Sequence, residues 1–306
     1  MSCRDTDVIP KVDGAGEVRD GVQIMHNGVL VEADGYQGPW MTEIIRQLRG
    51  HHEGQEELAF HVVLERLAAT AGLSPAVIEL GSWWAYYSLW ARKRIPGARS
   101  FCVEPDPAYL EVGRGNFKRN GLDAWFHHAA VGYGPSPAAP FLCESDGLEH
   151  DVPFEGLGSL LDHFGLERAD LLLVDIQGAE VPMLDGARDL LRAGRVRFMV
   201  ISTHHHRISG DPLTHDRCLM LLRELGGHII TEHTVAESFT GDGLIVVSFD
   251  EQDRGLEIIT SRCRVGDSLF GDPLWDLDAA NQQIAALRAA PPAAPEPEPR
   301  RRFLRR

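Results

Sequence analysis

Apolar and amphipathic runs alternate along the chain from about residue 77 to residue 249. The short apolar runs expected to form strands are 77–80, 100–104, 125–130, 171–175, 197–202, 228–231 and 244–249. The longer amphipathic runs expected to form helices are 85–93, 107–119, 178–193 and 213–225. Apolar strands that alternate with amphipathic helices are typical of a parallel sheet covered by helices on both faces.

The last two expected strands are joined differently from the others. Only the segment "EHTVAESFTGDG" lies between them, and it is too short for a helical crossover. Two strands joined by such a loop pair antiparallel. The pattern therefore predicts an α/β fold, with a doubly wound, mostly parallel sheet of seven strands in which the last strand is reversed.

The regions on either side of this pattern differ from it. Residues 1–74 predict an α+β extension, a possible lid or substrate region, with a hairpin over 22–32 and a later helix. The core domain is expected over 75–250, and a C-terminal extension over 251–290 contains a short helix. Its narrow apolar stripe, Leu277 to Leu287, is suited either to a homodimer contact or to packing back on the domain. Residues 291–306 form a tail rich in proline and arginine that we expect to be disordered.

Charge and cysteine content narrow the class of protein. The 306-residue chain is 43% hydrophobic and has a formal net charge of −15. Its one basic run is the last seven residues, so a nucleic-acid substrate is not expected. Five cysteines without a C-x-x-C pair indicate a reduced, cytoplasmic protein. We find neither a secretory signal nor an apolar run of membrane-spanning length.

The stretch "VIELGSWWAYYSLWA", residues 77–91, predicts a buried strand, a tight turn and the start of a helix. Ligands of open α/β sheets bind beyond the carboxyl ends of the strands. The dinucleotide pattern G-x-G-x-x-G is absent, and two tryptophans occupy the space that a pyrophosphate needs. Glu79, Gly81 and Ala85 instead fit [D/E]-x-G-x-x-x-[G/A], a loop suited to S-adenosylmethionine, which carries no phosphate.

The next two strand ends support the same cofactor. Glu104 ends the second strand, where a carboxylate can accept hydrogen bonds from both ribose hydroxyls, or alternatively cap the next helix. Ala129 and Ala130 end the third strand and leave room for a flat adenine. The residues expected to bind the cofactor are Glu79, Gly81, Ser82, Ser88, Glu104, Pro105, Asp106, Ala130 and Asp175.

Four segments together resemble the FkbM-type S-adenosylmethionine-dependent methyltransferases. They are "IELGSWWAYYSLW", "EPDP…NFKRNG", "LLLVDIQGAEVPMLDGARDLL" and "ESFTGDGLIVVSF". The most telling piece, "VDIQGAE", is similar to the family's D-[VI]-E-G-x-E, although Gln177 replaces the usual acid and Ala85 the usual second glycine. The resemblance implies a class I, Rossmann-like methyltransferase that O-methylates sugars, glycans or glycosylated natural products.

Methyl transfer to a hydroxyl requires removal of the hydroxyl proton. Asp175, which ends the fourth strand, and His204 or His205, which end the fifth, are the expected catalytic residues. Helix capping is the alternative role for Asp175, and exposed rings in a polar loop are the alternative for the histidines. A divalent metal is possible but not favoured, because Gln177 and His204 suit magnesium poorly.

Two further polar segments are candidates for the acceptor site. The run "GHHEGQEELAF", residues 50–60, predicts either a solvated helix start or a lid over the acceptor. Glu237 and Asp242 precede the last strand and are candidates to line the entrance of the same acceptor site. Trp83, Trp84, Tyr86 and Tyr87 are divided between core packing and the pocket rim. The alternatives to a methyltransferase are a nicotinamide oxidoreductase and a degenerate scaffold of the same fold without turnover.

Overall fold

The computed structural model describes residues 3–263 and 273–289, and its central element is a seven-stranded sheet. The strands, in spatial order, are β12 (His228–His233), β13 (Gly243–Ser248), β11 (Val196–Thr203), β10 (Ala169–Val174), β4 (Ala76–Leu80), β5 (Arg99–Glu104) and β6 (Trp125–His128). Only β13 runs against its neighbours, pairing antiparallel with both β11 and β12. The expected doubly wound, mostly parallel fold with a reversed last strand is therefore confirmed.

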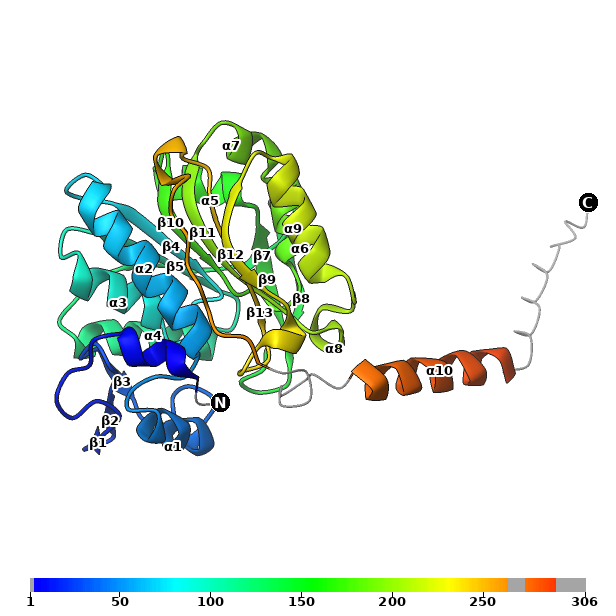
Figure 1. Ribbon diagram of the computed structural model, residues 1–306, viewed down its shortest axis with the longest axis horizontal. Coiled ribbons are helices and arrows are strands. Elements are labelled where there is room, and N and C mark those ends of the chain that lie inside the picture. Colours follow the sequence, from blue (N-terminus) through cyan, green and yellow to red (C-terminus); the bar gives the residue numbers. More distant parts are fainter. Residues whose placement is uncertain (1–2, 264–272, 290–306) are drawn as a thin grey trace, which may run out of the picture. The chain divides into compact units, whose positions relative to one another are not determined.

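Helices cover both faces of this sheet, as the alternation of strands and helices predicted. One face carries α2 (Gly54–Thr70), α3 (Tyr86–Arg94) and α4 (Pro107–Arg119), and the other carries α5 (Leu157–His163), α6 (Glu180–Gly186), α7 (Arg188–Arg192) and α9 (Thr214–Glu224). Figure 1 shows α2 and α3 on one side of the sheet and α6 and α9 on the other. Successive strand residues feed the two cores in turn: Val77, Leu171 and Val200 pack on the first face, and Ile78, Leu172 and Ile201 on the second.

Two expected elements are interrupted. The run 178–193 forms two short helices, α6 and α7, which meet at Ala187. The run 125–130 ends as a strand of the main sheet at His128, and Ala130–Val131 form a separate strand, β7. β7 belongs to a second, three-stranded sheet in the order β7-β9-β8.

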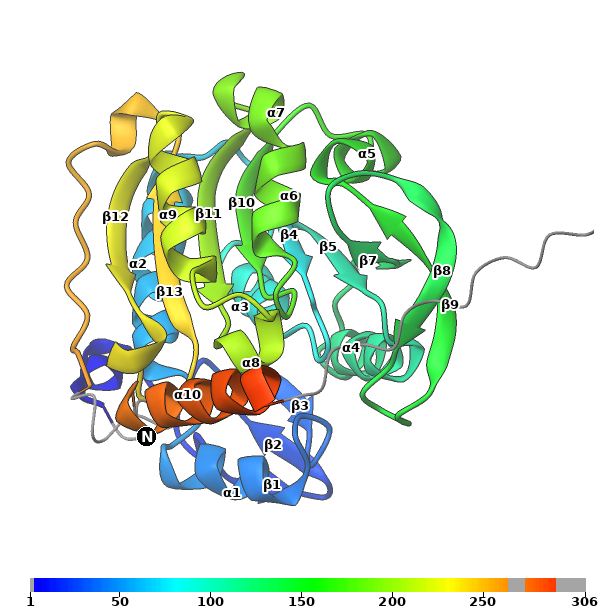
Figure 2. The same ribbon diagram turned by 90° about the vertical axis from the view of Figure 1, so that its right-hand side faces the viewer.

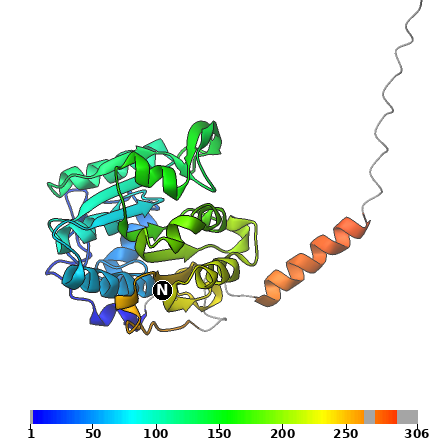
Figure 3. The same ribbon diagram turned by 90° about the horizontal axis from the view of Figure 1, so that it is seen from above.

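This second sheet was not predicted from the sequence. It contains β8 (Ser136–Leu142) and β9 (Glu149–Glu155), which form an antiparallel hairpin. β8 contains two prolines, which are tolerated at a sheet edge, and β8 is an edge strand that is largely exposed. Figures 2 and 3 show the hairpin, drawn in green, projecting from the body of the molecule.

The N-terminal residues form 3-10 helix η1 (Arg4–Val8), strands β1 (Val18–Arg19), β2 (Val22–Ile24) and β3 (Leu30–Glu32), and helix α1 (Pro39–Gln47). The hairpin expected over 22–32 is confirmed as the β2–β3 pair. The side-chain oxygens of Asn116 and Asn120 on α4 accept hydrogen bonds from the backbone of β3. Figures 1 and 2 show β1–β3 and α1 below the edge of the main sheet where α8 (His206–Ser209) follows β11, which is the carboxyl edge of the parallel strands.

Beyond β12, the chain forms two short 3-10 helices, η2 (Val235–Glu237) before β13 and η3 (Glu251–Asp253) after it. The expected C-terminal helix is α10 (Pro273–Ala289), which belongs to a separate unit, Asp272–Arg306. Its Leu277 and Ile284 are exposed within that unit, and the dimer suggested by this stripe stays a prediction. The predicted disordered tail, 291–306, lies outside the described residues. None of the described helices is long and apolar enough to span a membrane.

Candidate active site

The turn after β4 depends on Gly81. Its φ of +76° is a left-handed conformation that favours glycine. A Cβ atom at this position would lie only 1.7 Å from the backbone oxygen of Asp175, which follows β10. Gly81 therefore allows the ends of β4 and β10 to approach closely, and this contact brings the expected cofactor loop beside the expected catalytic aspartate.

The rest of this loop is held by β5. The backbone N–H groups of Gly81 and Ser82 both donate to the carbonyl of Val103, at 2.9 and 3.0 Å. Trp83 and Ala85 have φ values of +34° and +57°. Ala85, where the family has a second glycine, thus occupies a left-handed conformation at the N-cap of α3. Trp83 and Ala85 therefore adopt a backbone conformation that their residue types do not favour. The hydrogen bonds to β5 hold the loop in place.

Two buried carboxyl groups stand at the ends of β4 and β5. Glu79 accepts a hydrogen bond from the N–H of Ser88, and Glu104 accepts from the N–H groups of Trp83 and Asp106. Burial raises the pKa of each to about 7, against the hydrogen bonds that lower it. Glu104 does not cap α4 as its alternative role required, because Asp106 is the N-cap. Glu104 instead connects the cofactor loop to the turn after β5.

The other expected cofactor residues differ in how their side chains are used. The Ser82 hydroxyl is buried and has no hydrogen-bond partner among the described residues, so it is available to a ligand. Ser88 packs its hydroxyl against Cys102, and Asp106 holds Ser145 of the β8–β9 hairpin as well as capping α4. The remaining two are Pro105, whose carbonyl accepts from His128, and the buried Ala130.

Asp175 and His204, both predicted as catalytic, lie in contact. His204 Nε2 is 3.0 Å from Asp175 Oδ1, an ion-pair contact whose direction is poor for a hydrogen bond. Nδ1 is 2.8 Å from Oε1 of Glu180, which is fully buried at the start of α6. Asp175 is 42% exposed at its side chain, so the three residues run from the interior to an accessible carboxylate. Asp175 does not cap a helix, since α6 begins at Glu180.

The ionisation of His204 differs from that expected of a general base. Burial opposes its charged form, but the contacts with Asp175 and Glu180 outweigh burial and hold its pKa well above the usual range. The two carboxylates therefore favour the protonated form of His204. This direction is opposite to what a general base near pH 7 needs, because His204 lies between two carboxylates, and its catalytic role stays a prediction. Its chemical effect is to hold Asp175.

Asp242 completes this group from the loop before β13. Its Oδ1 lies 3.8 Å from His204 Nε2. Burial raises the pKa of Asp242 to about 7, and the nearby carboxylate of Asp175 also raises it, while His204 lowers it. A carboxyl group with a pKa near 7 has the ionisation that a general base needs at neutral pH. Asp242 is therefore a second candidate for the general base beside His204.

The other candidate residues, His205, Gln177 and Glu237, make contacts of other kinds. The His205 ring caps α8, with Nδ1 accepting from the N–H of Arg207, and it lies against the ring of His206. Gln177, at a φ of +53°, donates from its side-chain amide to Asp175. Glu237 accepts from the backbone N–H of Thr234 and pairs with Arg262. Glu237 thus takes part in a local cap and an ion pair.

The polar run 50–60 is not a solvated helix start. His51, His52, Gln55, Glu56 and Glu57 are all buried, so that alternative was wrong. The reason is that the N-terminal extension and α3 cover the start of α2, and the polar groups satisfy one another. His52 Nδ1 lies 2.9 Å from Glu57 Oε1, and Glu56 accepts from the Ser202 hydroxyl at 2.6 Å. Ser202 belongs to β11, so the start of α2 contacts the strand that His204 directly follows.

Aromatic rings line the same region. Trp84, Tyr86 and Tyr87 are buried, more than the even division that the sequence suggested, while Trp83 is half-buried and stacks on Tyr109 at 3.7 Å. Tyr36, from the N-terminal extension, stacks on Trp84 with ring centroids 4.4 Å apart. No motif in the sequence pointed to Tyr36. Glu180, by contrast, had a signal, since it is the final acid of the quoted "VDIQGAE".

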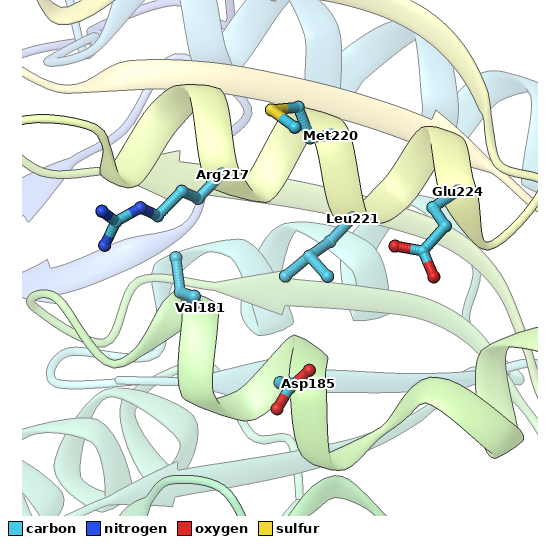
Figure 4. A pocket seen from close by; sticks show the side chains of 6 residues that line it. All are labelled: Val181, Asp185, Arg217, Met220, Leu221 and Glu224. Carbon is cyan, nitrogen blue, oxygen red and sulfur yellow. The ribbon is translucent and has the colours of Figure 1, made fainter.

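Two other features lie outside this group. Among the described residues, the one set of three His, Cys, Asp or Glu side chains with ligand atoms within 4.8 Å of one another is His26, His51 and Glu57. Figure 4 shows a groove of about 280 Å³ between α6 and α9, lined by Val181, Asp185, Arg217, Met220, Leu221 and Glu224. Neither contains Asp175, His204 or Asp242, so the geometry gives no support for a metal at the expected catalytic residues.

Comparisons with known proteins agree with this arrangement. The model of the methyltransferase FkbM domain matches residues 68–229, slightly more than half of the chain. No match is found among curated proteins. The match with a methyltransferase domain does not support the nicotinamide oxidoreductase alternative.

Several solved structures resemble the chain. One is the N-terminal domain of human METTL16 in complex with SAH, at 14% identity over 75% of this chain and 89% of that chain, with a TM-score of 0.44. Another is a precorrin-6y C5,15-methyltransferase from Geobacter metallireducens GS-15, at 17% identity over 61% and 86%, with a TM-score of 0.39. M. capricolum TrmK with S-adenosyl-homocysteine matches at 11% identity over 74% and 84%, with a TM-score of 0.38. Similarities at this level give no information about the acceptor.

Proposed function

Because the chain belongs to the FkbM methyltransferase family, we propose that it transfers the methyl group of S-adenosylmethionine to a hydroxyl of a sugar, a glycan or a glycosylated natural product. The observation that carries this proposal is the convergence of Asp175, His204 and Asp242 in one group, at the edge of the sheet where Gly81 follows β4. Ligands of doubly wound sheets bind at that edge.

The residues around Gly81 fit the cofactor. Ser82 offers a buried hydroxyl that lacks a partner among the described residues, and a buried donor or acceptor without a partner is costly. Glu79 and Glu104 offer buried carboxyl groups at the two strand ends beside it. S-adenosylmethionine, when bound, supplies a methyl group on a sulfonium centre. We assign its binding to Glu79, Gly81, Ser82 and Glu104, while Ser88 and Asp106 support the surrounding backbone.

The chain's own contribution to the chemistry is to orient the acceptor and to move its proton. Positioning alone lowers the barrier of a displacement reaction by several kcal/mol, on the order of 7–11 when the geometry is ideal. Glu180 contacts His204 from the buried side, and His204 in turn contacts the Asp175 carboxylate and orients it. Asp175 then orients the acceptor hydroxyl. Asp242, with a pKa of about 7, accepts the proton as the hydroxyl attacks.

The first experiment is calorimetric titration of the full chain with S-adenosylmethionine and, separately, with NADH. We expect a micromolar dissociation constant for S-adenosylmethionine and no response to NADH. Ser82→Ala should weaken binding about five-fold, the equivalent of roughly 1 kcal/mol for one hydrogen bond. Ser136→Ala, at the exposed start of β8, is the matched control and should bind as the unaltered chain does.

The second step separates binding from turnover. Asp242→Asn should retain S-adenosylmethionine binding but lose most of the methyl transfer to a hydroxyl acceptor, on the order of 100-fold or more in kcat, because a general base contributes that much. Methyl transfer is followed with cofactor that carries a tritiated methyl group. S-adenosylmethionine binding without turnover on any hydroxyl acceptor would favour the degenerate scaffold, and a response to NADH alone would contradict the proposal.

A further inference from the structure

Three side chains of the N-terminal extension form one buried cluster, which we call the His26 cluster: His26, His51 and Glu57. His26 follows β2, His51 lies in the loop before α2, and Glu57 belongs to the first turn of α2. None of the three residues is more than 1% exposed. Each offers one ligand atom, and these atoms lie within 4.8 Å of one another. Two imidazoles and a carboxylate from three segments of the chain therefore meet in the interior.

The backbone brings the two imidazoles together. The N–H of His26 donates to the carbonyl of Gly50 at 3.0 Å. Gly50 has a left-handed φ of +87°, and a Cβ atom there would lie 2.3 Å from the backbone nitrogen of His26. Glycine thus allows the loop before α2 to approach the turn after β2 closely. As a result, the ring of His51, the next residue, stacks on the ring of His26 with centroids 4.2 Å apart.

Each of these imidazoles has one ring nitrogen in use and one without a partner. His26 Nδ1 lies 3.1 Å from the carbonyl oxygen of Pro10, and it carries the proton because a carbonyl can only accept. His51 Nδ1 is in hydrogen-bond contact with Oε2 of Glu57. The Nε2 atoms of both rings are buried and have no hydrogen-bond partner among the described residues. A buried polar atom without a partner is costly, so both atoms require an explanation.

The same pattern of hydrogen bonds is typical of metal-binding histidines. A histidine that binds a metal through one ring nitrogen usually donates the other N–H to a backbone carbonyl or a carboxylate, which fixes the tautomer and the orientation of the ring. Pro10 is this partner for His26, and Glu57 is this partner for His51. Glu57 is itself held by His52, whose Nδ1 lies 2.9 Å from Oε1.

The charges around the cluster suit a divalent cation. Among the ion pairs of the described residues, Glu57 contacts His51 and His52 but no lysine or arginine. His52 also lies 3.3 Å from Oε2 of Glu53. Even with both His51 and His52 protonated, the two carboxylates balance their charges, and a metal that binds His51 displaces its proton. The two carboxylates and one imidazolium then leave one negative charge, which the cation offsets.

We propose that His26, His51 and Glu57 bind a divalent transition-metal ion, and Zn²⁺ is the probe for the test. Imidazole nitrogens and a carboxylate oxygen are a common ligand set for zinc, whereas Mg²⁺ prefers oxygen ligands. Ligand atoms of a tetrahedral zinc ion lie about 3.3 Å apart. The cluster, with its atoms within 4.8 Å, reaches this spacing by rotation of the side chains. Water takes the fourth position, as in other zinc sites with three protein ligands.

The metal site belongs to the N-terminal extension. All three ligands precede residue 68, where the match with the FkbM domain begins, so the inference does not rest on the proposed function. The ring of His26 also lies against Trp90 of α3, with centroids 4.4 Å apart. A metal here connects the turn after β2, the loop before α2 and α2 itself, beside α3. Because the unfolded chain does not bring these ligands together, metal binding stabilises the fold.

The test is a titration of the metal-free full chain with Zn²⁺. The chain is treated with a chelator, dialysed and titrated with zinc chloride in a calorimeter. We expect one ion per chain with a dissociation constant below about 1 μM. With zinc at about 100 times this constant, the thermal unfolding midpoint should rise by about 5 °C or more. Mg²⁺ at the same concentration should produce neither effect.

Two matched variants locate the site. His26→Gln should weaken zinc binding about 100-fold or more, because even the loss of an outer hydrogen-bond partner costs about 10–100-fold in metal affinity. His61→Gln is the control. His61 belongs to α2 and also lies near Trp90, with centroids 6.2 Å apart, but it is not part of the cluster, so this variant should bind zinc as the unaltered chain does. Circular dichroism confirms that each variant is folded.

The position of the ion is also measured without any variant. Crystals of the zinc-loaded, unaltered chain should give an anomalous difference peak between His26, His51 and Glu57. This measurement decides the matter if His26→Gln does not fold. Three results overturn the proposal: no submicromolar zinc binding, an unchanged zinc affinity in folded His26→Gln, and a zinc peak only elsewhere, such as at the histidine run 204–206.

Discussion

Gly81 shows how one residue without a side chain determines the geometry of the site. We expect Gly81→Ala to destabilise the chain by about 3 kcal/mol or more, because the new Cβ would lie 1.7 Å from the Asp175 oxygen and φ is left-handed. The measurement is the free energy of unfolding in urea. Gly72→Ala is the control, since it has open space around it and should change stability by less than about 1 kcal/mol. Equal effects of the two variants would contradict this account.

Ala85 is the opposite case, because it carries a side chain at a backbone conformation in which glycine would be less strained. Its left-handed φ of +57° costs on the order of 1 kcal/mol, and its buried methyl group contributes about as much by packing. We therefore expect Ala85→Gly to be nearly neutral in urea unfolding. Ala91→Gly, a buried position inside α3, loses packing without relief of strain and should cost about 1–2 kcal/mol. A comparable loss in both variants would show that Ala85 is not strained.

The site residues that sequence predicted are those that follow strands. Asp175 and His204 end neighbouring parallel strands, so their contact follows from the order of strands alone. The ionisation of His204 did not follow, because it depends on Glu180 behind the ring. The burial of Glu56 and Glu57 could not be predicted either. Charged residues at the start of a helix are usually exposed, and they are buried only when another element covers them. In both cases the outcome depends on contacts with residues that are distant in the sequence.

At the scale of elements, a buried ion pair connects the end of the sheet to α2. Arg197, at the start of β11, donates to both carboxylate oxygens of Asp253 in η3, and Arg66 of α2 donates to the same carboxylate. We expect Asp253→Asn to cost about 3–5 kcal/mol in urea unfolding, because it leaves a buried arginine without its charge partner.

Asp250→Asn is the matched control for that variant. Asp250 pairs with Arg168 nearer the surface and also caps η3, a role that asparagine retains. Its loss should be about 1 kcal/mol or less. If Asp253→Asn were no more damaging than Asp250→Asn, the buried pair would not hold η3 against the sheet.

Element prediction succeeded where periodicity was regular and failed where it was not. All seven strands of the main sheet were expected because each is a short apolar run. The strands of the β8–β9 hairpin contain three prolines and many exposed residues, and β9 also pairs with β7. A strand that is stabilised by pairing with the edge of another strand is difficult to predict from its own residues.

At the scale of the whole molecule, the acidic groups of the site make stability depend on pH. Burial raises the pKa of Glu79 from 4.5 to about 7. Between these values the folded chain holds a proton that the unfolded chain has released, so stability falls as pH rises through this window and levels off above about pH 7. His26 and His233, whose pKa values burial lowers to about 4, act in the opposite direction, since the unfolded chain takes up protons first as pH falls below 6.5.

The contribution of Glu79 is isolated by comparing Glu79→Gln with the unaltered chain, because the histidine effects cancel in the difference. Glutamine keeps an oxygen to accept from Ser88 but does not ionise. We expect the variant to gain about 3 kcal/mol relative to the unaltered chain between about pH 4.5 and pH 8, as measured by urea unfolding at several pH values. Glu111→Gln, on the exposed face of α4, controls for the removal of one carboxyl group. A constant difference across this range would show that Glu79 gives up its proton as readily in the fold as in the unfolded chain.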